Sequence, residues 1–137
     1  MDLNHNTLFQ FYQNLGKLFY AIAAIDNSVR DEEFEVLEKL VKKYWLSKSI
    51  IEDSSANNLK ANIIETFKWL RDDREYDAEA CYNSFINFKK QNESIFTDNI
   101  NSLILKTAGE ISASFSGQNK SEVILLAKLN IELKKGK

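Results

Sequence analysis

Oxygen-bearing side chains gather in one short stretch of the chain, between two apolar segments. Four acids and a hydroxyl fall within eight residues: Asp26, Ser28, Asp31, Glu32 and Glu33. Carboxylate and hydroxyl oxygens are the hard ligands that Ca²⁺ and Mg²⁺ require. One interpretation is therefore a divalent-cation site to which Asp26, Asp31 and Glu33 supply ligands.

The same acids have a second interpretation as helix caps. Asp26 suits a turn, and the run from Asp31 to Glu33 puts negative charge where a following helix begins, which the helix dipole favours. An EF-hand is excluded. Counted from Asp26, Asp31 stands where that loop needs glycine, and Leu37 stands where it needs a bidentate glutamate. The sequence leaves a cation site and a set of caps as alternatives.

His5 and Cys81 are the single histidine and the single cysteine of the chain. Together they fall short of the four nitrogen or sulfur ligands of a structural zinc site, and one cysteine forms no disulfide within the chain. We expect His5 at the surface and Cys81 as a small core residue. No glycine-rich phosphate loop accompanies them. With no catalytic residue to name, the sequence predicts no enzyme.

The elements that position these residues are predicted to be helices. Apolar residues recur every three or four positions in six segments, roughly 7–25, 31–46, 57–71, 77–91, 97–115 and 119–133. Asp77 is the predicted N-cap of the fourth segment. Zero prolines and 4 glycines leave few of the residues that tight β-turns need. The sequence therefore predicts an all-α fold of about six helices.

Four aromatic residues are predicted to lie at the edge of the core. Tyr12 and Tyr20 fall where the apolar arc of the first segment meets its polar side. Trp45 and Trp69 fall near helix ends, where we expect them to pack along the core edge. The alternative for the two tryptophans is a partner surface, because exposed aromatic residues are enriched at interfaces.

Composition and charge narrow the class of protein. The 137 residues are 44% apolar, which supports one domain, residues 1–137, with a sizeable core. The 18 basic and 20 acidic residues lack the basic excess that nucleic acids demand. The longest apolar run, Leu18–Ile25, is too short to span a bilayer, and the N-terminus lacks a signal peptide's basic region. We expect a cytoplasmic protein that neither binds nucleic acid nor inserts into a membrane.

The first two predicted helices match the last two when the sequence is shifted by 89 residues. Leu15 falls on Ile104, and Ile22 falls on Ile111. The acid of the first turn is not repeated, because Asp26 falls on Phe115. The match predicts two helical repeats related by a pseudo-twofold axis.

The segment from Ala23 to Glu33 resembles the helix–turn–helix signature of the tellurite-resistance TerB-like family. Five residues match that signature by position: Ala23, Asp26, Val29, Glu32 and Glu33. Asn27 stands where the signature has glycine, and Arg30-Asp31 stand where it has Ser-Pro. A second copy, from Ala113 to Glu122, keeps the alanine and the final acid.

The resemblance implies a helical domain of two three-helix repeats, linked to tellurite and general stress resistance. It also implies a divalent-metal role for clustered acids. We therefore expect a non-enzymatic, TerB-like stress-response module that binds a protein partner or forms a homo-oligomer. The alternative is a metal-binding or metal-sensing domain using Asp26, Asp31 and Glu33. Apart from that divalent cation, no cofactor is expected.

Overall fold

A computed structural model describes residues 5–24, 31–46, 62–72, 77–114 and 120–134. These ranges hold six α-helices and no strand: α1 His5–Ala24, α2 Asp31–Val41, α4 Asn62–Asp72, α5 Ala78–Gln91, α6 Asp98–Ser114 and α7 Lys120–Lys134. The π-helical turn η1, Lys42–Leu46, continues α2, and the 3₁₀ turn η2, Glu93–Ile95, lies between α5 and α6. The prediction of an all-α fold of about six helices is confirmed.

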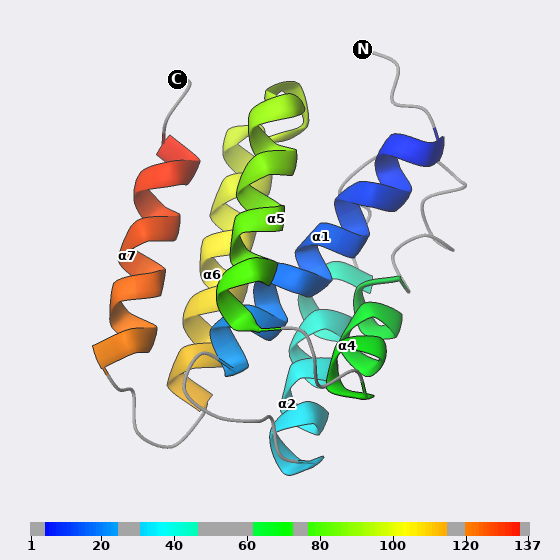
Figure 1. The fold of residues 1–137 in the computed structure, drawn as a ribbon, viewed down its shortest axis with the longest axis vertical. Helices are drawn as coiled ribbons and strands as arrows, with labels where there is room; N and C mark the ends of the chain where they lie inside the picture. The colour runs from blue at the N-terminus through cyan, green and yellow to red at the C-terminus, as the bar shows by residue number, and fades with distance from the viewer. Residues whose placement is uncertain (1–4, 25–30, 47–61, 73–76, 115–119, 135–137) are drawn as a thin grey trace.

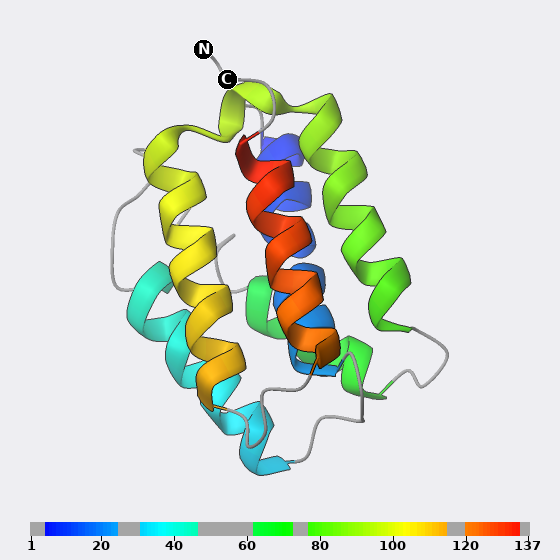
Figure 2. The same cartoon turned by 90° about the vertical axis from the view of Figure 1, so that its left-hand side faces the viewer.

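The first helix is the centre of the bundle. α1 packs against α4, α5, α6 and α7, while α2 packs against α6 and α4. The bundle is seen from two sides in Figures 1 and 2, and in Figure 2 α7 lies in front of α1. This position follows from the sequence, because apolar residues cover most sides of α1. Its five most regularly spaced core residues are wholly buried: Leu8, Phe11, Leu15, Leu18 and Ile22.

The central position of α1 overturns one expectation. Tyr12 and Tyr20 are 1% and 8% exposed, so they are buried and do not lie at a water boundary. A helix surrounded by neighbours leaves little of its circumference for solvent, and its amphipathic side chains are then covered as well. The apolar arc of this helix is wider than its polar residues suggest.

The contact between α1 and α4 depends on a glycine. A Cβ atom at Gly16 would lie 2.8 Å from the backbone oxygen of Ile63 and 2.8 Å from Cβ of Thr66. Only a residue without a side chain allows so close an approach of two helix backbones. Gly16 therefore sets the spacing of this helix pair.

The turn η1 joins the end of α2 to α6 through a buried polar contact. Trp45 is wholly buried, and its Nε1 donates a hydrogen bond to Oγ1 of Thr107 at 3.0 Å. The Thr107 hydroxyl donates in turn to the backbone oxygen of Leu103 at 2.8 Å. The indole group thus has the partner that its burial requires. The expectation that Trp45 lies at the core edge is wrong, because this residue reaches the core centre.

Helix α5 begins where the sequence predicts it. Asp77 caps α5 by accepting a 2.6 Å hydrogen bond from the backbone nitrogen of Ala80, so the predicted N-cap is confirmed. Among the helices described, none has both the length and the apolar character needed to cross a membrane.

Candidate functional site

The predicted cation site lies mostly outside what the structure describes. Asp31 is the first residue of α2, and Glu33 lies in its first turn, which places both where the cap interpretation expects acids. Asp26 falls outside the described residues, as do the side chains of Asp31 and Glu33. Within the described part of the chain, no three His, Cys, Asp or Glu side chains are grouped to hold a metal ion. The cation site therefore stays a prediction.

Cys81 is a core residue, as predicted. Its side chain lies on α5 and is 2% exposed. Burial raises the pKa of the thiol to about 11, while the charge of Lys17 lowers it and that of Asp77 raises it further. A thiol with so high a pKa stays protonated at neutral pH and is a poor nucleophile.

We expect Cys81 to react with a disulfide reagent about 100-fold more slowly in the native protein than in the unfolded chain at pH 8.5. Unfolding returns the thiol pKa to its ordinary value near 8.5 and exposes the sulfur. Reaction with Ellman's reagent, with and without guanidinium chloride, measures both rates at the single cysteine. Equal rates would contradict the burial described above.

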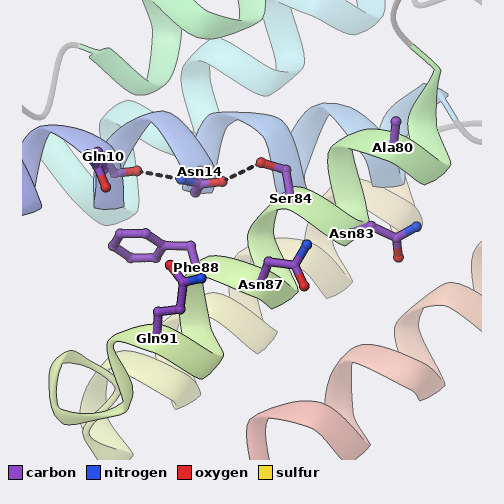
Figure 3. A pocket seen from close by; sticks show the side chains of 8 residues that line it. All are labelled: Gln10, Asn14, Ala80, Asn83, Ser84, Asn87, Phe88 and Gln91. Atoms are coloured by element: carbon purple, nitrogen blue, oxygen red, sulfur yellow. Dashed lines mark hydrogen bonds between the residues drawn. The ribbon is translucent and has the colours of Figure 1, made fainter.

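An open groove runs between α1 and α5, with a volume of about 560 Å³ (Figure 3). Six of its lining residues carry neutral polar side chains: Gln10, Asn14, Asn83, Ser84, Asn87 and Gln91. Phe88 and Ala80 complete the described lining, none of whose side chains is charged, and the ammonium group of Lys17 lies beside it, 3.2 Å from Oγ of Ser84. The described lining thus offers neutral hydrogen-bonding groups, with one ammonium group next to it.

A chain of hydrogen bonds ties the two walls of this groove together. Nζ of Lys17 donates to Oγ of Ser84 at 3.2 Å, and this hydroxyl donates to Oδ1 of Asn14 at 2.9 Å. Nδ2 of Asn14 then donates to the backbone oxygen of Gln10 at 2.9 Å (Figure 3). The chain holds Asn14, which is 8% exposed, in one orientation. This groove was not predicted from the sequence. Its one signal was the four-residue spacing of Asn83, Asn87 and Gln91.

A second polar cluster lies where η1 meets α6. The ammonium groups of Lys43 and Lys106 lie 5.1 and 5.2 Å from the ring centroid of Tyr44. Hydrogen bonding to Glu110, together with burial, raises the pKa of the Tyr44 phenol. Tyr44 therefore stays protonated at neutral pH, and the cluster holds two cations against its ring.

The outer side of α7 carries aliphatic residues that the core does not use. Ile124 and Ile131 are 46% and 59% exposed, and Ala127 between them is exposed too. The core side of the same helix consists of Leu125, Leu129 and Leu133. Residues seven apart lie two turns apart on one side of a helix. We call Ile124, Ala127 and Ile131 the α7 stripe.

Trp69 on α4 is also exposed, to 49%. A half-exposed tryptophan fits both packing along the core edge and a place at a partner surface, so both stay predictions. The α7 stripe, Trp69 and the neutral groove are thus the surface features from which a function can be argued. No known protein family, curated protein or solved structure matches the chain.

Proposed function

We propose that the protein is a non-enzymatic, TerB-like stress-response module that works through protein contacts, with the α7 stripe as the contact surface and a second copy of the chain as its partner. The observation that carries the proposal is the exposure of Ile124 and Ile131 on one side of α7. The family and the stress response come from the resemblance of the segment Ala23 to Glu33.

The spacing of the stripe suits pairing with a copy of itself. Ile124, Ala127 and Ile131 follow the three-then-four spacing of a coiled-coil seam, and the small Ala127 permits close approach at its centre. A twofold interface uses the same residues from both copies, so four isoleucines are buried together. The same-side spacing supports a helix-to-helix contact between copies.

The exposed area indicates a weak association. Fully burying one isoleucine is worth about 1.5–3 kcal/mol relative to full exposure, and roughly half of each stripe isoleucine is already covered. The loss of translational and rotational freedom on association offsets part of this free-energy gain. We therefore expect a dimer that forms with rising concentration and separates on dilution.

Sedimentation equilibrium between about 10 µM and 1 mM tests the proposal. The average mass of the wild-type protein is expected to rise above the 15.8 kDa of one chain. Ile131→Lys places a charge in the stripe and is expected to keep the mass at that of one chain. Ser102→Lys, at an exposed position on α6, adds the same charge elsewhere and should associate like wild type. A wild-type mass of one chain throughout would contradict the proposal.

A further inference from the structure

We propose that the groove between α1 and α5 binds an extended, uncharged peptide segment of a partner protein, held through the backbone of that peptide. This inference rests on the proposed function in that the ligand is a protein, but it uses a different surface. The residues that carry it are the amides of Asn83, Asn87 and Gln91 on one wall and that of Asn14 on the other.

The spacing of the amides on α5 matches an extended peptide. Asn83, Asn87 and Gln91 are four residues apart, which is about 6.0 Å along a helix axis. Alternate residues of an extended chain are about 6.7 Å apart and point their backbone groups to the same side. Over the two intervals the mismatch is roughly 1.4 Å, which the longer side chain of Gln91 can absorb. Successive amides along α5 can therefore contact alternate residues of a bound peptide, one residue for each amide.

The chemistry of the amides matches the peptide backbone as well as their spacing. A carboxamide carries two N–H donors and an accepting oxygen, the same kinds of group that a peptide unit presents. Asn83, Asn87 and Gln91 are exposed on the groove wall (Figure 3). A peptide in the groove can exchange donor and acceptor pairs with them without bringing a charge.

The opposite wall is already held in place. Asn14 is 8% exposed. Its amide donates one hydrogen bond to the backbone oxygen of Gln10 and accepts one from the hydroxyl of Ser84. A carboxamide has two N–H donors and two oxygen lone pairs, so the Asn14 amide has one further N–H and one lone pair for a ligand. Because the hydrogen bonds to Gln10 on α1 and from Ser84 on α5 fix this amide, it is already ordered before a ligand arrives, which favours binding.

Peptide fits the groove better than sugar does. Carbohydrate sites combine hydrogen-bonding groups with an exposed aromatic face, whereas Phe88, the one aromatic residue of the described lining, is 6% exposed. The groove is open to solvent, and its volume of about 560 Å³ leaves room for an extended segment of a few residues.

The test uses a library of N-acetylated, C-amidated hexapeptides with uncharged side chains, from which binders are selected and measured by fluorescence anisotropy. We expect micromolar binding that weakens about tenfold in Asn87→Ala. N-methylation of alternate backbone nitrogens in the peptide should weaken it by a similar factor. Alanine is the better helix former, so the variant is expected to fold. Asn99→Ala, at an exposed position on α6, is the matched control and should bind like wild type.

Any of three results with peptides would overturn the inference: no hexapeptide bound below about 1 mM, binding unchanged in Asn87→Ala, or N-methylated peptides bound equally well. Binding of neutral hexasaccharides in place of peptides, with the same dependence on Asn87, would also overturn it. The proposed function is tested separately, because Asn87→Ala should leave the sedimentation behaviour unchanged and Ile131→Lys should leave peptide binding unchanged.

Discussion

Replacing Phe11 with alanine is expected to lower the free energy of unfolding by about 3–5 kcal/mol. Phe11 is wholly buried on the central helix, and four rings surround it at centroid distances of 5.1 to 6.4 Å: Tyr12, Trp45, Phe88 and Phe96. Three of these rings belong to other parts of the bundle, each held by its own contacts. The cavity left by the missing ring therefore cannot close by a local shift.

Urea denaturation followed by circular dichroism measures this loss. Phe9→Ala is the matched control, because Phe9 lies on the same helix but is only partly buried. Its loss should be clearly smaller, as less area returns to water and the site is open to solvent. A loss at Phe11 no greater than that at Phe9 would mean that the aromatic cluster is not the centre of the core.

Gly16→Ala is expected to destabilise the protein by about 1–3 kcal/mol. The new methyl group would meet the backbone oxygen of Ile63 and Cβ of Thr66, both at 2.8 Å. Neither atom belongs to the flexible end of a side chain, so α4 must move away from α1. This strain outweighs the helix propensity gained, which is about 1 kcal/mol at most.

Gly109→Ala provides a control of the opposite sign. A Cβ atom at Gly109, within α6, would have no heavy atom within 4 Å. Only the propensity term remains, so we expect a gain of roughly 0.5–1 kcal/mol. Urea denaturation of both variants measures the two signs. If Gly16→Ala were as stabilising as Gly109→Ala, the close crossing of α1 and α4 would be refuted.

Helix positions could be predicted from the sequence because the apolar spacing is regular and the caps are local. The predicted segment 97–115 became Asp98–Ser114, and the predicted N-cap of α5 is Asp77. The predicted segment 31–46 contains α2 and η1, yet nothing in its spacing distinguishes a π-helical turn from an α-helix. Local rules thus fix the presence of a helix more readily than its fine geometry.

The side of a helix that is buried depends on the neighbouring helices, and the spacing of apolar residues alone does not show where those helices lie. Tyr12 looks like a boundary residue in sequence but is 1% exposed, with the ring of Phe11 5.1 Å from its own. On α7 the leucine side packs against the bundle while Ile124 and Ile131 face outward, although isoleucine is as apolar as leucine. Because apolar and polar residues are spread around α7, its sequence gives only a weak signal for the side that is left exposed.

The candidate sites also differ in whether they depend on residues close in sequence or on tertiary packing. The acids Asp26, Asp31 and Glu33 attract notice because they are close in sequence, and they remain a prediction. The groove could not be predicted from the sequence, because Asn14 and Ser84 are far apart in the chain and come into contact only where α1 packs against α5. A polar site built by tertiary packing is visible in sequence only as scattered amides on otherwise ordinary helices.

Methyl NMR of protein labelled at the isoleucine δ1 carbons tests the central claim, contact through the α7 stripe, most directly. On dilution from about 1 mM to 20 µM, the methyl signals of Ile124 and Ile131 are expected to shift as copies separate. The wholly buried Ile104 and Ile111 should keep their positions. Shifts confined to other isoleucines, or constant signals from Ile124 and Ile131, would contradict association through this surface.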